Sequence, residues 1–260
     1  MFKMKKLLAF ALATVMGCAM LTGCSSKEVS DLDYIKENGK IVMGLDDSFP
    51  PMGFRDEQGN IVGYDVDLAK EVAKRMDLEL ILQPIDWATK ELELENKNID
   101  VIWNGFSYTE ERAAALTLSD PYMQNTQVVM VLEGSNIKTL SDLKGKKVAV
   151  QDGSSAQNAL KADEDLYAAI TPVDFKDNMT ASLDVKNGNV DALAIDSVVA
   201  KYYMSKNPGF RLLDQTLAPE DYVIGFRKGD VKFQAEVDRI LDEMEKDGTM
   251  KQIQANWFAE

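Results

Sequence analysis

The sequence contains no histidine, and its only two cysteines, Cys18 and Cys24, both lie within the first 24 residues. The absence of histidine excludes Ser-His and Cys-His nucleophile pairs and histidine-ligated metal sites. Because no cysteine follows residue 24, the main part of the chain has neither a disulfide framework nor thiolate chemistry. These absences favour binding over catalysis, and we expect no cofactor, no metal site and no catalytic residue.

Basic residues are also scarce relative to acidic ones. The chain has 29 Lys and Arg against 43 Asp and Glu, and its formal net charge is −14 at pH 7. Nucleic-acid binding needs clustered cations, so we expect no nucleic-acid partner. The same acidity disfavours direct adsorption on an anionic membrane, so any attachment to a membrane has to come from a lipid.

The first 23 residues have the composition of a secretory signal peptide. Lys3, Lys5 and Lys6 precede an apolar run over residues 7–21 and the small residues before Cys24. This run is too short to prefer spanning a bilayer, which needs about 20 apolar residues. The basic start, the apolar run and the small residues therefore predict that residues 1–23 are removed.

The segment Leu-Thr-Gly-Cys, residues 21–24, resembles the lipobox of bacterial lipoproteins. The resemblance implies cleavage before Cys24, diacylation of its thiol and acylation of the new amino terminus, which together hold a protein stably on a membrane. The alternative is an ordinary signal peptide with an incidental cysteine. Cys18 is a weaker lipidation candidate, because the apolar run continues past it.

Residues 24–31 are polar and predict a tether, after which apolar runs alternate with amphipathic segments. Apolar residues at a spacing close to 3.6 predict helices, and short apolar runs predict strands. The predicted strands cover residues 40–45, 79–83, 100–103, 127–132, 147–151, 191–195 and 222–226. The predicted helices cover residues 64–76, 87–96, 156–162, 181–187, 197–205, 231–246 and a short segment to 258. This alternation predicts an α/β fold with largely parallel sheets, in which ligands bind beyond the carboxyl ends of strands.

Polar and aromatic residues cluster where the predicted strands end. The candidates for a ligand site are Asp46, Phe49, Trp87, Asn104, Gly105, Ser107, Arg112, Ser154, Ser155 and Asp196. Taken singly, each has an ordinary structural explanation. Ser154 and Asp196 can cap the helices that follow them, Arg112 can be a solvated helix residue, and the aromatic residues can belong to the core.

Taken together, these residues have the chemistry of a receptor for a free α-amino acid. Arg112 can bind a carboxylate through two parallel hydrogen bonds. Ser107, Ser154 and the free amides at a helix start can complete the shell of that carboxylate. Asp196 can bind an ammonium group. A zwitterion needs opposite charges on the two sides of one site, and these strand ends can supply both.

The chain resembles the polar amino-acid-binding proteins of ABC importers over roughly residues 38–258. The motifs that carry the resemblance are GLDDSFPPMGF (44–54), GYDVDLAKEVAKRM (63–76), TEER (109–112), SDPY (119–122), LSDLKGKKVAVQDGSS (140–155), NGNVDALAID (187–196) and DGTMKQIQANWF (247–258). The resemblance implies a two-lobed type II periplasmic-binding-protein fold, with a ligand cleft between lobes joined by a two-strand hinge. Lobe 1 is expected over residues 32–124 and 222–260, lobe 2 over 128–218, and the hinge crossings at about 124–128 and 217–222.

The family pattern also implies roles for the charged residues. Arg112 is expected to bind the α-carboxylate of the ligand, assisted by Ser107 and by the turn at Ser154 and Ser155. Asp196 is expected to bind the α-ammonium, with the backbone carbonyl of Gly105 as a second acceptor.

At the side-chain end of the ligand, the pattern implies that Phe49 and Trp87 form a sandwich and that Asp46 reaches the far end. Asn104 departs from the small residue usual before the glycine, and the helix after Trp87 reads ATKELELENKN instead of an aliphatic-rich sequence. Aromatic faces opposite a carboxylate suit a cation, so arginine is the first expected ligand. Glutamine is the second, because an aspartate also accepts from an amide. A glutamate ligand would require Asp46 to point away or to be protonated.

The resemblance implies a free L-amino acid ligand, an ABC permease and ATPase complex as partner, and no enzymatic activity. We expect a monomer outside the cytoplasm, lipid-anchored through Cys24 to the outer face of the cytoplasmic membrane. A Gram-positive cell is favoured, and an inner-membrane anchor facing a periplasm is the alternative. Two rival functions use the same fold: a cyclohexadienyl dehydratase with a carboxylic acid as proton donor, and a sensory or adhesin role.

Overall fold

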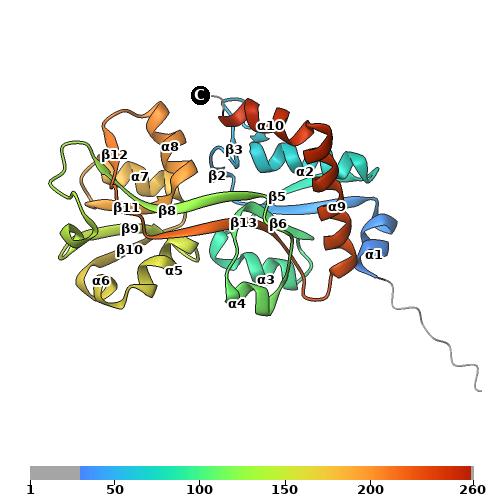
Figure 1. Cartoon of the computed structure of the whole chain (residues 1–260), viewed down its shortest axis with the longest axis horizontal. Helices are drawn as coiled ribbons and strands as arrows, with labels where there is room; N and C mark the ends of the chain where they lie inside the picture. The colour runs from blue at the N-terminus through green and yellow to red at the C-terminus, as the bar shows by residue number, and fades with distance from the viewer. Residues whose placement is uncertain (1–29, 259–260) are drawn as a thin grey trace, which may run out of the picture.

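Two lobes lie side by side in the computed structural model, which describes residues 30–258, and two adjacent strands run from one lobe to the other (Figure 1). The first lobe contains helices α1 to α4, strands β1 to β7, and the last two helices of the chain. The second lobe contains strands β9 to β12 and helices α5 to α8. The chain therefore leaves the first lobe, builds the second, and returns.

A ten-stranded sheet extends through both lobes, with the main order β10-β9-β11-β8-β13-β6-β1-β5. In the first lobe β5 (Glu79–Pro84), β1 (Lys40–Leu45) and β6 (Val101–Ser107) are parallel. In the second lobe β10 (Thr171–Phe175), β9 (Lys147–Gln151) and β11 (Ala192–Asp196) are parallel. The α/β fold expected from the sequence is therefore confirmed, with parallel strands in each lobe.

The two strands that connect the lobes are antiparallel to each other and to their other neighbours. They are β8 (Met123–Leu132) and β13 (Ala218–Phe226), and the pairing runs from Ala218 opposite Gln127 to Tyr222 opposite Met123. Beyond this stretch β8 pairs with β11 in the second lobe, and β13 pairs with β6 in the first. The residues expected to form the hinge thus lie largely within the paired stretch of this two-stranded ribbon.

Helices cover both faces of the sheet (Figure 1). In the first lobe they are α1 (Asp31–Asn38), α2 (Tyr64–Arg75), α3 (Lys90–Glu95, after a 3-10 turn over Trp87–Thr89) and α4 (Glu110–Ala115). In the second lobe they are α5 (Ser155–Ala162), α6 (Glu164–Ala169), α7 (Asn178–Lys186) and α8 (Ser197–Lys206). The chain ends in α9 (Val231–Asp247) and α10 (Thr249–Phe258).

The last two helices close the first lobe. Helix α9 buries Phe233, Val237, Ile240 and Met244, which recur at the helical spacing that places them on one face. The helix ends at Gly248 in the left-handed conformation, where the sequence predicted its end. Figure 1 shows α9 and α10 lying over the first lobe, with α10 near β3 (Gly53–Arg55), where the ring centres of Trp257 and Phe54 are 5.8 Å apart.

Several expectations about element boundaries need correction. Strands β8 and β13 begin four residues before their predicted starts at 127 and 222, because the added residues pair with each other. Strand β6 continues to Ser107, so Asn104, Gly105 and Ser107 lie within it and not after it, because pairing with Tyr222 and Val223 of β13 extends the strand. Helix α1 begins at Asp31, so the predicted tether over residues 24–31 overlaps it by one residue. The small sheet of β2 (Ser48–Phe49), β3 and β4 (Ile61–Val62) was not predicted, nor were helices α1, α4 and α6 and strands β7 (Thr117–Leu118), β10 and β12 (Phe210–Leu212).

The predicted signal peptide, Cys18 and the predicted lipidation site Cys24 lie outside the described residues. Across residues 30–258, none of the helices combines the length and the apolar character that crossing a membrane requires.

Candidate functional site

Strands from both lobes end at the boundary between them, and polar side chains at these ends touch across it. Gln151 Nε2, at the end of β9, donates to Asp46 Oδ2, just after β1, at 2.7 Å. Ser107 Oγ at the end of β6 and Ser155 Oγ at the start of α5 are 2.9 Å apart. The two lobes are therefore in direct contact, and three of the four contacting residues, Asp46, Ser107 and Ser155, were assigned to a ligand site from the sequence.

Arg112 is held rigidly at the start of α4. Its guanidinium carbon lies 4.1 Å from the centre of the Phe106 ring, and its Nη1 donates to the Ser107 carbonyl at 2.7 Å. Its Nε lies 3.6 Å from a Glu91 carboxylate oxygen. Within residues 30–258 the guanidinium donates no hydrogen bond other than that to Ser107, so N–H groups remain for a carboxylate ligand.

A cavity of about 430 Å³ opens beside Arg112 and has walls from both lobes. Lys90, Thr109 and Arg112 line it from the first lobe, and Gly153 and Asn158 line it from the second. This volume falls in the range of small-molecule sites. Burial lowers the pKa of the Arg112 guanidinium, while the carboxylates of Glu91 and Glu220 act in the opposite direction.

Asp196 ends β11 and is almost fully buried. Its Oδ1 accepts hydrogen bonds from Asn125 Nδ2 at 2.8 Å, Gln127 Nε2 at 2.9 Å and Tyr222 Oη at 2.6 Å. Its side chain makes no capping hydrogen bond to α8, so the explanation of Asp196 as a simple helix cap is wrong. Burial raises the pKa of Asp196 well above its usual range, and the neighbouring Glu220 carboxylate raises it further.

The two serines of the predicted carboxylate-binding turn have different roles. Ser154 is the N-cap of α5, and its hydroxyl accepts from Gln157 N at 3.2 Å, so its structural explanation is confirmed. The Ser155 hydroxyl instead faces the cleft, where it meets Ser107 and accepts from Gln127 Nε2 at 3.1 Å.

Gly105 lies in β6 where no other residue would fit. Its φ is +56°, and an added Cβ would lie 2.8 Å from Phe49 Cε1 and 3.1 Å from Tyr222 Cζ. Its N–H donates to the fully buried Asp65 of α2 at 2.7 Å, and Tyr122 Oη donates to the same carboxyl at 2.9 Å. Burial raises the pKa of Asp65 to about 7, against these two hydrogen bonds, which lower it.

The residues expected to contact the ligand side chain are all buried, but they do not form one wall. Asp46 Oδ1 accepts from Ser48 N at 2.9 Å, and the backbone N–H of Asp46 donates to Asn104 Oδ1 at 3.1 Å. Burial raises the pKa of Asp46 to about 6. Asn104 Nδ2 is buried and bonds to no acceptor in the described chain.

The two aromatic residues of the expected sandwich belong to separate hydrophobic clusters. Phe49 packs beside Gly105, whereas Trp87 packs edge-on against Phe106, with ring centres 6.1 Å apart. The sandwich around a ligand therefore stays a prediction.

Several cleft residues were not found from the sequence. Gln151 lies at the end of a strand, as Asp46 lies just after one, and could have been found by the same rule.

Lys90 lies in the helix after Trp87, whose sequence departs from the family pattern. It is 2% exposed, and its Nζ donates to the Gly153 carbonyl of the other lobe at 2.9 Å. Burial lowers the pKa of Lys90 to about 8. Gln127 and Glu220 lie inside the connecting strands, so a search of the residues at strand ends does not find them.

These features define a class of protein: a two-lobed receptor with a buried arginine on one lobe and a buried aspartate on the other. Residues 30–258 contain no cluster of three or more His, Cys, Asp or Glu side chains suited to a metal ion. The cleft presents hydrogen-bonding groups and charges of amino-acid side chains to a ligand.

Residues 41–260 match the profile of the bacterial extracellular solute-binding proteins, family 3, and the chain belongs to this family. It is 31% identical to the arginine-binding extracellular protein ArtP of Bacillus subtilis over 262 residues, which cover 98% of each chain. It is 30% identical to the L-cystine-binding protein TcyJ of Escherichia coli K12 over 254 residues, 95% of this chain and 94% of that one.

A solved structure supports the same assignment. The substrate-binding protein of an ABC uptake transporter from Streptococcus pneumoniae, with bound histidine, superposes with a TM-score of 0.86 at 33% identity. The match covers 89% of this chain and 97% of that one. The type II periplasmic-binding fold expected from the sequence is thus confirmed, and the protein is a solute-binding protein and not an enzyme.

Proposed function

We propose that this protein captures a free polar L-amino acid between its lobes and delivers it to an ABC permease. The observation that carries the proposal is the placement of Arg112 and Asp196, opposite charges buried on opposite lobes at one cleft. Burying a zwitterion is costly unless each charge is paired, and this cleft offers one partner for each. ArtP and TcyJ are named for arginine and cystine, and the structure of the Streptococcus pneumoniae protein contains bound histidine. All three ligands are α-amino acids and carry the α-ammonium and α-carboxylate groups.

The ligand is proposed to favour the closed arrangement of the lobes. A ligand shifts a two-state equilibrium only through contacts that differ between the states. Arg112 and Ser107 on one side and Asp196 and Ser155 on the other can bind one ligand together only when the lobes meet. The hinge is proposed at about residues 124–128 and 217–222, between lobe 1 (32–124 and 222–260) and lobe 2 (128–218).

Arginine is proposed as the first ligand and glutamine as the second. Asp46 is a buried carboxylate at the cleft whose Oδ2 accepts from the Gln151 amide. A guanidinium or an amide of the ligand can take the place of that amide. Phe49 and Trp87 are proposed to flank the ligand side chain, with Asn104 beside it. The Gly105 carbonyl is proposed as a second acceptor for the α-ammonium.

The protein is proposed to be anchored through Cys24 to the outer face of the cytoplasmic membrane, after removal of residues 1–23. The same anchor would serve a sensory receptor, but the similarity to transporter receptors favours uptake. A permease and an ATPase encoded beside this gene would support import.

A thermal-shift screen tests the ligand class directly. The purified protein is unfolded and refolded to remove carried ligand, then heated with each of the twenty amino acids, ornithine, citrulline and cystine. A ligand at 100 times its Kd should stabilise the fold by about 2.7 kcal/mol, a shift that is easily measured. A response to arginine or lysine alone supports a cation pocket at Asp46. A response to glutamine alone keeps the zwitterion site and contradicts that pocket, and no response to any of them contradicts the proposed function.

The preference for arginine over glutamine is expected to fall at acidic pH. The pKa of Asp46 is raised to about 6, and a bound guanidinium would lower it, so arginine binding has to displace a proton below pH 6. The ratio of the Kd for glutamine to that for arginine should therefore drop about tenfold between pH 7 and pH 5. Isothermal titration at both pH values measures this ratio, and Asp46→Asn should make it constant. A constant ratio in the unmodified protein would place the arginine side chain elsewhere.

A further inference from the structure

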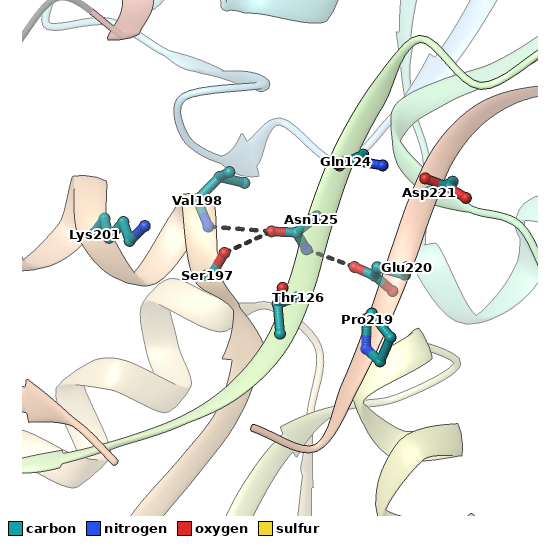
Figure 2. Close-up of a pocket in the computed structure, with 9 residues that line it drawn as sticks. All are labelled: Gln124, Asn125, Thr126, Ser197, Val198, Lys201, Pro219, Glu220 and Asp221. Carbon is teal, nitrogen blue, oxygen red and sulfur yellow. Dashed lines mark hydrogen bonds between the residues drawn. The ribbon is translucent and has the colours of Figure 1, made fainter. Parts of the chain in front are cut away.

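Two carboxyl groups meet where the second connecting strand crosses between the lobes. Asp196 ends β11, and Glu220 lies in the part of β13 that pairs with β8. Figure 2 shows Glu220 beside Asn125 of β8, joined to it by a hydrogen bond, near the start of α8. Both residues line a cavity of about 460 Å³. Ser197 Oγ and Val198 N of that helix hold Asn125 Oδ1, which fixes the direction in which the amide nitrogen points.

The same two amide nitrogens bind both carboxyl groups. Asn125 Nδ2 donates to Asp196 Oδ1 at 2.8 Å and to Glu220 Oε1 at 2.5 Å. Gln127 Nε2 donates to the same two oxygens at 2.9 Å and 2.7 Å. One oxygen of each carboxyl therefore lies within 2.9 Å of both nitrogens, which places the two carboxyl groups next to each other.

The negative charge of this pair has no direct partner among the basic side chains that the structure describes. No lysine or arginine in residues 30–258 forms an ion pair with Asp196 or Glu220. Gln127 is 1% exposed, and its Oε1 is a buried acceptor without a donor in the same part of the chain. The pair and this oxygen form a site with an excess of acceptors that a positively charged donor would complete.

The groups that surround the two carboxyl groups leave the pair able to bind a proton. Tyr222 of β13 donates to Asp196, Arg112 of α4 acts on both carboxyl groups at longer range, and Lys201 of α8 lines the cavity with Glu220. Burial raises the pKa of Asp196 most, followed by the charge of Glu220 and a hydrogen bond with it. Adjacent carboxylates repel each other, so such a pair holds one proton between its members.

We propose that Glu220 belongs to the ammonium site, and that Asp196 and Glu220 share one proton that the ligand α-ammonium displaces as it binds. The inference rests on the proposed function, because it requires an ammonium ligand at Asp196. The proton leaves to the buffer, no bond of the ligand changes, and N–H groups of the ligand take its place between two carboxylates. Gln127 Oε1 is the third acceptor for the same ammonium.

The number of protons released when the ligand binds tests this proposal directly. Isothermal titration of L-glutamine and L-arginine at pH 7.5, in phosphate, HEPES and Tris, gives the number of protons released from the dependence of the heat on the ionisation heat of the buffer. We expect about one proton per ligand for the unmodified protein. At this pH Asp46, with a pKa of about 6, is already ionised and contributes little.

Glu220→Gln should reduce the release measurably, because Asp196 then remains buried but loses the adjacent carboxyl group with which it shares the proton. Glu133→Gln is the matched control: Glu133 follows β8 on the second lobe, is exposed, takes no part in these hydrogen bonds, and should leave the release unchanged. If the unmodified protein binds its ligand without releasing a proton, this inference is overturned and the proposed function remains intact. This measurement needs no variant. Equal release by the unmodified protein and Glu220→Gln would also overturn it. Failure of every amino acid to bind would overturn both.

Discussion

Replacement of Arg112 by alanine is expected to weaken ligand binding by about 2–5 kcal/mol, or roughly 30-fold to several thousand-fold in Kd. The guanidinium is fixed by the Phe106 ring and by the Ser107 carbonyl, so its free N–H groups are already oriented. Without it, the ligand carboxylate would be buried in the cleft without the guanidinium that is proposed to bind it. Isothermal titration with the amino acid that gives the largest thermal shift measures the loss.

Arg239→Ala is the control for this prediction. Arg239 is half exposed on α9, pairs with Glu236 and Glu243 on the same helix, and lines neither of the two cavities described above. Exposed ion pairs of this kind contribute less than about 1 kcal/mol, so its loss should leave affinity unchanged. Near-normal affinity of Arg112→Ala would show that the carboxylate is bound elsewhere.

Replacement of Gly63 by alanine is expected to destabilise the first lobe by about 3–5 kcal/mol, because backbone strain and overpacking add at one site. Gly63 immediately precedes α2 with φ of 149° and ψ of 171°, a region open in practice only to glycine. An added Cβ would overlap the Met52 carbonyl oxygen and lie 2.8 Å from the Gly53 nitrogen. Thermal unfolding should show a fall in Tm of roughly 10 °C.

Gly59→Ala measures the cost of backbone strain alone, without the steric overlap that an alanine at residue 63 would cause. Gly59 has φ of +84°, but nothing lies within 4 Å of an added Cβ. Its replacement should cost only about 1–2 kcal/mol, the price of a left-handed residue. Similar Tm values for the two variants would mean that the backbone near Met52 moves aside, contrary to our expectation.

Where the pattern of neighbouring residues determines a helix or strand, the sequence was sufficient to predict it. Helix α2 was predicted at residues 64–76 and spans Tyr64–Arg75, because its buried residues recur at the helical period. Strand β9 was predicted at 147–151 and spans Lys147–Gln151, because a short apolar run forms a buried strand. By contrast, β6 extends to Ser107 through pairing with Tyr222, more than 100 residues away in the chain, and no local pattern could show this.

The candidate site likewise contains residues that the sequence could predict and residues that only the tertiary structure shows. The ends of parallel strands of one lobe meet at one edge of a sheet, so strand ends alone led to Asp46, Ser107, Arg112 and Asp196. Gln127 and Glu220 lie in mid-strand and gain their importance only because β8 and β13 pair in a register that turns both toward Asp196. Lys90 has a surface-type side chain that tertiary packing buries against the carbonyl of Gly153.

The sequence by itself determined the α/β alternation, the family resemblance and the choice of a zwitterion as ligand, because periodicity, motif order and charged residue types are properties of the chain. Only the tertiary structure decided which groups meet across the cleft: Gln151 with Asp46, Ser107 with Ser155, and Asp196 with Glu220. The physical reason is that hydrogen bonds and charge repulsion act over a few ångströms. Residues tens of positions apart reach that distance only after the strands have paired and the two lobes have met.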